Sequence, residues 1–156
     1  MSNQHHRDLL EQGTDAWNIW RQEHPTVSPD LHEDDLSGLQ MSGANLSNAN
    51  LSGTKLNGAT LSKADLEYAN LVGADLSKSD LSEANLQGAD LSAALLTEAN
   101  LAATNLSNVM LLDANLSGAT LTQANLSNAD LTGALLKQTD LKDAVVAPEQ
   151  LKRART

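Results

Sequence analysis

The strongest constraint on the fold of this chain is a hydrophobic period of five residues. From Leu31 to Leu151 every fifth residue is Leu, apart from Met41 and Val146, so Leu holds 23 of 25 such central positions. In the 23 units centred on Leu36 to Val146, the residue two before the central one is Ala in 16. The residue just before it is Asn in eight units and Asp in seven. The chain is therefore a tandem array of short units.

A period of five is incompatible with a straight helix or a straight strand. On an α-helix each step of five rotates the side chain by about 500°, so the Leu row would visit every face. On a strand an odd step moves each successive Leu to the opposite face. A chain that turns a corner once per unit instead directs every central Leu to one axis. Four corners close a square, and we expect successive coils to stack as parallel strands about 4.8 Å apart.

Glycine and asparagine mark the corners. Eight of the nine Gly residues fall two positions after a central residue, and Asn48, Asn108 and Asn128 share that slot. Because Gly and Asn tolerate positive φ, we expect a type II or similar turn there. Elsewhere the slot holds longer side chains, at Lys63, Lys78, Glu83 and Gln123. The pattern leaves the turn type open at those corners.

The units resemble a known repeat. They read A-N-L-S-N, A-D-L-E-Y, A-N-L-S-G and A-D-L-T-G, which is similar to the A(D/N)LXX consensus of pentapeptide repeat proteins over about residues 34 to 147, without an inserted loop. The resemblance implies an all-β solenoid, a right-handed quadrilateral parallel β-helix. With 23 units at four per coil it has slightly under six coils and a length of about 28 Å. The early W-N-x-W-R sequence resembles the N-terminal segment of many cyanobacterial members.

We divide the chain into three parts: residues 1–29 as a helix and linker, 30–148 as the β-helix, and 149–156 as a basic tail. Central leucines throughout the repeats are expected to form the structural core. They include Leu46, Leu51, Leu66, Leu71, Leu86, Leu91, Leu106, Leu111, Leu126 and Leu131.

The segment before the repeats predicts one helix. Between His5 and Glu23, apolar residues that include Leu10, Trp17 and Trp20 are spaced for one helical face. Pro25 ends this helix. We expect an N-terminal α-helical cap that shields the first coil from water and from edge pairing. The alternative is an arm that binds a partner.

The tail differs from the rest of the chain in charge. Half of the 10 basic residues lie from Lys137 onward, whereas the whole chain has a net charge of -10. Two interpretations remain open. The basic tail either offsets carbonyl groups and acids of the last coil or docks an acidic partner.

The sequence predicts no catalytic, metal or cofactor site. All four His residues precede the repeats, Cys is absent, and carboxylates on a convex rod lack the cleft that would separate their pKa values. The negative charge disfavours direct nucleic acid binding and an anionic membrane. No apolar stretch approaches the roughly 20 residues of a membrane span, and Met1 to Asp8 is polar. We expect a cytoplasmic protein that is not an enzyme.

A few outward positions are apolar where the repeat usually places polar side chains. Leu95, Met110, Leu112 and Leu135 are the candidates for a partner surface. Four units per coil place Leu95 and Leu135 on one side, two coils apart, and Met110 with Leu112 on the next side. Either these residues are scattered surface leucines and a methionine, or they form a contiguous patch.

The first functional hypothesis is a scaffold that binds a protein partner, as a monomer or homodimer. The resemblance also suggests an alternative, a DNA-mimicking modulator of type II topoisomerase (gyrase). That branch resembles longer dimers with Phe at central positions, and this chain has no Phe. A regulatory role in cyanobacterial cell differentiation rests on the family resemblance alone.

Overall fold

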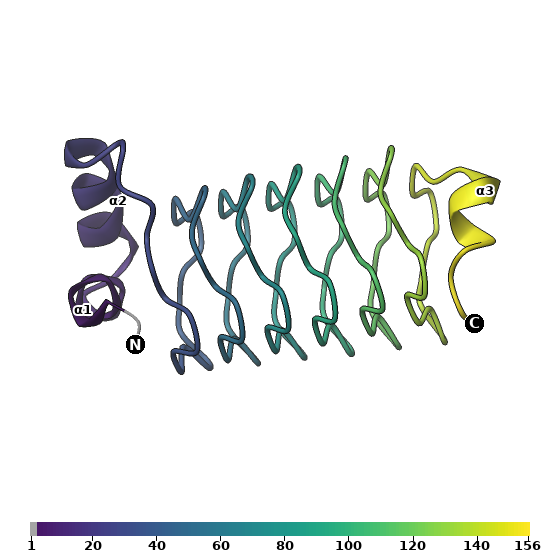
Figure 1. The fold of residues 1–156 in the computed structure, drawn as a ribbon, viewed down its shortest axis with the longest axis horizontal. Helices are drawn as coiled ribbons and strands as arrows, with labels where there is room; N and C mark the ends of the chain where they lie inside the picture. Colours follow the sequence, from purple (N-terminus) through teal and green to yellow (C-terminus); the bar gives the residue numbers. More distant parts are fainter. Residues whose placement is uncertain (1–2) are drawn as a thin grey trace.

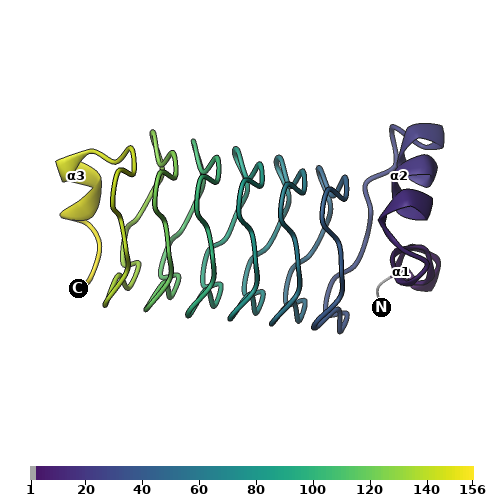
Figure 2. The ribbon, with the colours of Figure 1, turned by 180° about the vertical axis from the view of Figure 1, so that it is seen from behind.

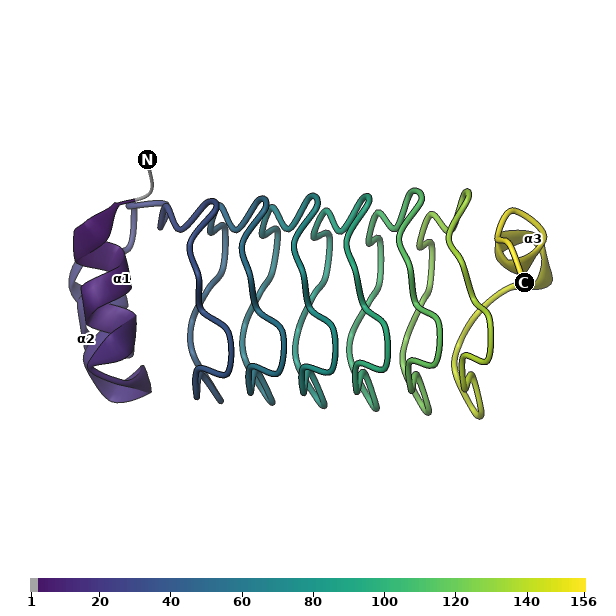
Figure 3. The ribbon, with the colours of Figure 1, turned by 90° about the horizontal axis from the view of Figure 1, so that it is seen from below.

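The chain winds into a stack of four-sided coils with helices at both ends (Figure 1). The computed structural model describes residues 3–156. Helices α1 (Gln4–Glu11) and α2 (Thr14–Glu23) lie at one end of the stack, and α3 (Pro148–Leu151) lies at the other. Views from behind (Figure 2) and from below (Figure 3) show the same rod, with the two termini at opposite ends. The repeats therefore form a solenoid.

Single parallel bridges join the coils in a constant register. Each bridge pairs the residue before a central position with the residue 20 positions later, as in Asp30 with Asn50. Four bridge series run along the rod and define its sides: side A begins at Asp30, side B at Asp35, side C at Gln40 and side D at Asn45. This register is the one that a period of five with four corners predicts.

Backbone hydrogen bonds run along the axis of the rod. Leu46 N–H donates to the carbonyl of Asp65 (2.7 Å), and Asn48 N–H donates to the carbonyl of Glu67 (2.8 Å). In the opposite direction, Asp65 N–H donates to the carbonyl of Ala44 (3.0 Å). The same three bonds recur from coil to coil, so buried backbone groups are satisfied by the neighbouring coils.

The interior is built from central Leu and the small residue two positions before it. Each of the ten central leucines expected in the core is at most 2 % exposed. Where the small residue is Thr, its hydroxyl is also satisfied: Thr54 Oγ1 donates to the carbonyl of Leu31, and Thr104 Oγ1 to that of Leu81, both at 2.9 Å. Close stacking of identical layers thus fills the core without Phe.

Hydrogen bonds explain why Asn or Asp precedes the central residue and Ser often follows it. Asn45 Oδ1 accepts from the backbone N–H of Ser47 (3.2 Å) and from its hydroxyl (2.7 Å). Neighbouring coils add amide ladders, because Asn105 Nδ2 donates to Asn85 Oδ1 (3.1 Å). The polar consensus therefore shapes the outer wall of the rod.

All corners share one backbone conformation. From Glu33 to Asp143, the residue two after each central position has φ between 55 and 73°, including Lys63 and Glu83. A hydrogen bond spans each turn, as from Ala44 N–H to the carbonyl of Met41 (3.0 Å). The corners that the sequence leaves open thus match the Gly corners. The axial hydrogen bonds hold even non-Gly residues in this left-handed region, where each costs about 1–2 kcal/mol.

Ala103 and its neighbour provide a test of this strain. Ala103 has φ of 56°, whereas Ala102 is not among the residues with positive φ. We expect Ala103→Gly to raise the free energy of unfolding by about 0.5–1 kcal/mol because Gly relieves the strain. The same change at the adjacent position, Ala102→Gly, should lower it by a similar amount. Denaturant unfolding measures both, and a loss of stability in Ala103→Gly would contradict this account.

The segment before the repeats forms two helices, so the single helix predicted there is wrong. α1 ends at Glu11, and Gly13, with φ of 109°, separates it from α2. Glycine adopts this backbone angle readily, and it lets the two helices pack against each other. Leu10, Trp17 and Trp20 are buried together with the first central residues. Both helices, rather than one, lie over the end of the solenoid.

Side chains of α2 replace the coil that is missing before the first repeats. Trp17 Nε1 donates to the carbonyl of Asn45 (2.7 Å), and Arg21 Nη2 donates to that of Ser47 (3.1 Å). The Asn18 carboxamide acts like a peptide group: it donates to the carbonyl of Gly43 (3.0 Å) and accepts from Asn45 N–H (2.8 Å). These bonds give partners to backbone groups on side D of the first coil that have no preceding coil to pair with.

We expect Asn18→Ala to lower the free energy of unfolding by about 1–3 kcal/mol, because it leaves the Asn45 N–H and Gly43 carbonyl without their partner. Gln22→Ala, on an exposed position of the same helix, is the matched control and should change stability by less than about 0.5 kcal/mol. Thermal or urea unfolding measures both variants. Equal effects would show that the Asn18 bonds do not hold the end closed.

A buried histidine of α1 pairs with the side A edge. His6 Nδ1 accepts from Asp30 N–H (3.0 Å), and Asn3 N–H donates to the Asp30 carbonyl (3.1 Å). Burial lowers the pKa of His6, with a smaller lowering from neighbouring His5 and Arg21; the approach of Nδ1 to the Asp30 carbonyl (3.4 Å), to which a protonated ring would donate, acts in the opposite direction. Since the folded chain holds His6 neutral, its ring nitrogen remains free to accept the backbone bond.

This geometry predicts a pH effect. Because the pKa of His6 is lower in the folded chain, the unfolded chain binds the proton more readily. The contribution of neutral His6 to the free energy of unfolding is therefore complete above about pH 6.5 and is lost as the pH falls toward the lowered pKa. We expect the melting temperature to fall between pH 7 and pH 5, with a shallower fall in His6→Gln. His5→Gln, on an exposed neighbour, is the control. Identical pH slopes for wild type and His6→Gln would contradict the prediction.

At the other end, the tail is part of the solenoid rather than separate from it. Arg155 forms a parallel bridge with Leu135 on side B, which continues the register beyond α3. The Gln150 carboxamide donates to the carbonyls of Leu126 (2.7 Å) and Ala129 (2.8 Å). A side-chain amide thus replaces a missing coil here also. The core at this end is covered less completely than at the N-terminal end, because Leu141 and Val146 are only half-buried.

Candidate interaction surface

The outward side chains form columns along each side of the rod. Side D is mostly an amide column, from Asn45 through Asn85 and Asn105 to Asn125. Side A carries Asp and Asn, with Met110 between Asp90 and Asp130 in the bridge series. Rigid, regular columns of this kind present polar groups at fixed spacing. Departures from the repeat therefore stand out as candidate recognition positions.

The four candidate residues for a partner surface gather around one corner. Leu95 and Leu135 lie on side B with Asn115 between them, and Met110 lies on side A. Leu112 lies in the turn that leads from Met110 to Asn115, between these two sides. Leu95 is 44 % and Met110 39 % exposed, while Leu112 and Leu135 are half-buried. The coil register thus joins residues that are up to 40 positions apart in the chain.

A fifth apolar residue extends this surface. Val72 is 37 % exposed and occupies the same turn position as Leu112, two coils earlier. The predicted patch omits it, although the same count of four units per coil places it at the corner of Leu112. We name Val72, Leu95, Met110, Leu112 and Leu135 the corner strip. Other exposed apolar residues, such as Tyr68 and Val145, lie off it.

Acidic side chains border the corner strip. Asp75 belongs to side B, Asp90 and Asp130 to side A, and Asp113 follows Leu112 in its turn. Hydrogen bonds from the hydroxyl and the backbone N–H of Thr132 lower the pKa of Asp130, which keeps this carboxylate charged. No Lys or Arg occurs between residues 79 and 136. The strip is therefore bordered mainly by carboxylates, with Arg155 beside Leu135 on side B.

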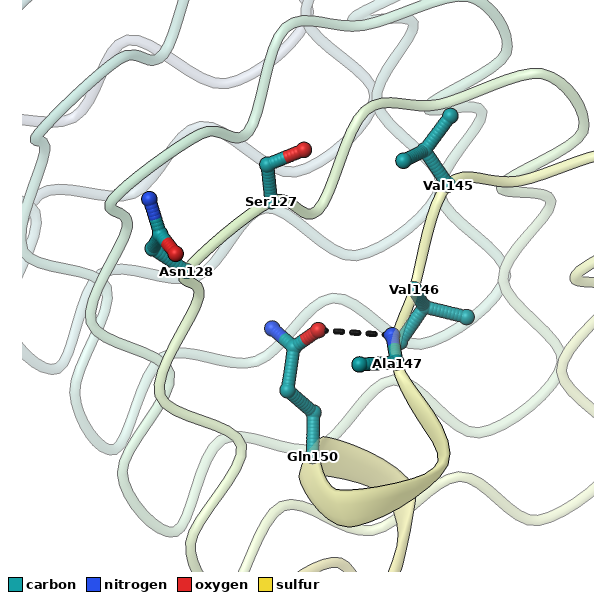
Figure 4. Close-up of a pocket in the computed structure, with 6 residues that line it drawn as sticks. All are labelled: Ser127, Asn128, Val145, Val146, Ala147 and Gln150. Carbon is teal, nitrogen blue, oxygen red and sulfur yellow. Dashed lines mark hydrogen bonds between the residues drawn. The ribbon is translucent and has the colours of Figure 1, made fainter.

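A shallow hollow lies near the last coil (Figure 4). It has a volume of about 220 Å³ and is lined by Ser127, Asn128, Val145, Val146, Ala147 and Gln150. Gln150 Oε1 accepts from Ala147 N–H (2.7 Å), so the Gln side chain closes one edge. None of the lining side chains titrates near neutral pH. The hollow offers no group for acid–base catalysis.

The structure describes residues 3–156. No three His, Asp or Glu side chains in this range converge to hold a metal ion. None of its helices has the length and apolar character that crossing a bilayer requires.

Comparison with protein families gives a match over most of the chain. Eight copies of the family model described as pentapeptide repeats align with residues 30–62, 44–83, 60–97, 84–123 and 124–145. The known structures of this family are right-handed quadrilateral β-helices. A search of curated proteins gave no significant match.

Solved structures of cyanobacterial proteins are among the similar ones. The chain is 33 % identical to alr5209, a pentapeptide repeat protein from Nostoc PCC 7120, over 78 % of this chain and 83 % of that one, with a TM-score of 0.46. It is 31 % identical to HetL, a pentapeptide repeat protein involved in heterocyst differentiation regulation in Nostoc sp. strain PCC 7120. That alignment covers 78 % of this chain and 73 % of HetL, with a TM-score of 0.37.

A more distant similarity concerns the fold alone. QnrB1, a plasmid-mediated fluoroquinolone resistance protein, is 16 % identical, with 75 % of this chain and 81 % of QnrB1 covered and a TM-score of 0.50. Identity at this level supports the same solenoid architecture and carries no conclusion about a shared target.

Proposed function

Because the chain belongs to the pentapeptide repeat family, we propose that it is a non-enzymatic interaction scaffold that binds a protein partner through the corner strip. The observation that carries the proposal is the gathering of five outward apolar residues, from Val72 to Leu135, at a single corner of an otherwise polar rod. Apolar side chains gathered on a surface with a polar border are typical of protein interaction sites.

The rigidity of the rod supports this role. Met110 N–H donates to the carbonyl of Ala89 (3.0 Å), and Leu95 N–H donates to that of Ala74 (2.9 Å), so the backbone beneath the strip is fixed before a partner arrives. A surface that is already ordered loses little conformational entropy on binding. The proposal includes no cofactor, no direct nucleic acid contact and a cytoplasmic location, as expected from the composition.

The alternative, a DNA-mimicking modulator of gyrase, has less support. A mimic of DNA needs negative charge at regular, phosphate-like spacing along its length. On side D the column holds neutral Asn85, Asn105 and Asn125 in succession, and Val145 follows. Carboxylates also lie on other sides, such as Asp80 and Asp140 on side C, and those beside the apolar strip favour recognition of a protein with a basic border.

Substitution of the strip tests the proposal. We expect the quadruple change Leu95→Ser, Met110→Ser, Leu112→Ser and Leu135→Ser to abolish partner capture from the native cell while leaving circular dichroism and coil stacking intact. The side chains point outward, so each loses little buried area within the rod. Pull-down and sedimentation velocity measure partner binding and self-association.

The matched control is Val145→Ser, which alters an exposed apolar residue on side D. This variant should retain the partner. Capture of the same partners by the quadruple variant and by wild type would remove the corner strip as the binding surface.

A further inference from the structure

The corner strip has a regular step along the rod. Val72, Leu95, Met110 with Leu112, and Leu135 belong to four successive coils, so each coil contributes at least one apolar side chain at this corner. Successive coils are about 4.8 Å apart, and the strip therefore extends about 14 Å parallel to the axis. It is a ridge of apolar contacts that follows the rod rather than encircling it.

The step matches the pitch of an α-helix. A helix laid along the axis rises about 5.4 Å per turn, so its apolar residues at i, i+4, i+7 and i+11 meet successive coils with a drift of only about 2 Å over the strip. An extended strand repeats a side chain on one face every 6.6 Å or so, and its drift over the same coils is about 5–6 Å. The spacing therefore favours a helix over a strand.

Several turns beside the corner strip have small residues, which would let a partner backbone approach closely. The slot after Val72 holds Gly73, the corresponding slot in the next coil holds Ala93, and that in the coil of Leu135 holds Gly133. The small residues Gly73 and Ala93 leave the neighbouring apolar side chains accessible to a partner backbone. At the fourth turn the Asp113 side chain lies over Gly133, since a Cβ added there would meet Asp113 Oδ1.

The carboxylates that border the strip favour a partner with basic residues. One carboxylate accompanies each coil: Asp75, Asp90, Asp113 and Asp130. Arg155 Nη2 lies 3.7 Å from Asp113 Oδ1 and weakly offsets that one. The remaining three have no ion pair with Lys or Arg among the described residues. A partner with basic residues beside its apolar face complements this pattern.

We propose that the corner strip binds a basic amphipathic α-helix of a partner protein, which lies along the axis of the rod. This inference rests on the proposed function, because it specifies the partner of the same surface. A second copy of the chain does not supply such a helix: α1 and α2 contain Asp8, Glu11, Asp15 and Glu23 against only Arg7 and Arg21, and Arg21 is buried.

Two synthetic peptides of equal composition test the inference. Both contain about 14 residues, four of them Leu and the rest Lys; one places Leu at i, i+4, i+7 and i+11, and the other at i, i+2, i+4 and i+6. We expect the helical-period peptide to bind the full chain at least about tenfold more tightly by fluorescence anisotropy, and to become helical by circular dichroism. Equal affinity of the two peptides would overturn the inference.

Variants locate the binding. The double variant Met110→Ser, Leu112→Ser should bind the helical-period peptide at least about tenfold more weakly. The double variant Asp75→Asn, Asp90→Asn should reduce the salt dependence of the peptide's affinity. The controls, Val145→Ser and Asp80→Asn, lie on sides D and C, away from this corner. Equal losses of peptide affinity in the strip and control variants would overturn the inference, because the peptide would then not bind specifically at the corner strip.

The outcome separates this inference from the proposed function. If the peptides fail to discriminate but the quadruple strip variant still loses its native partner, the scaffold proposal stands and the helical partner is excluded. If the native partner is retained by the quadruple variant, the scaffold proposal itself falls.

Discussion

The axial hydrogen-bond ladder is the interaction on which the rest of this structure depends. Each unit contributes bonds to both neighbouring coils: Asp65 N–H donates to the carbonyl of Ala44 in the preceding coil, and Leu66 N–H donates to the carbonyl of Asn85 in the next. The ladder fixes the 20-residue register, directs every central Leu inward and holds Lys63 or Ala103 at a φ that such residues rarely adopt. A solenoid gains this stability by summing contacts between nearest neighbours, so it also depends on what covers its ends.

Both ends use the same chemical solution. The carboxamide of Asn18 serves the first coil and that of Gln150 serves the last, each pairing with backbone groups that lack a neighbouring coil. A side-chain amide has the donor and acceptor of a peptide group, which makes it a direct substitute. The N-terminal end adds buried Trp17 and Trp20, so the two ends differ in how fully they shield the core.

Function is left to the outer walls, because the interior is used entirely for stacking. In the proposed scaffold role, recognition information lies in the places where the outward columns depart from Asn, Asp, Ser and Thr. The corner strip is such a place. Its regular step and carboxylate border are the features that support the proposed helical, basic partner.

The sequence by itself determined the family, the period and the inward row, because a step of five permits no straight element and the consensus covers nearly the whole array. It also indicated Leu95, Met110, Leu112 and Leu135 as unusual outward residues. The structure also showed that Gly13 divides two helices. Only the tertiary structure decided that every corner is left-handed and that Asn18 and Gln150 close the edges. These features depend on contacts between residues about 20 or more positions apart, which local patterns do not encode.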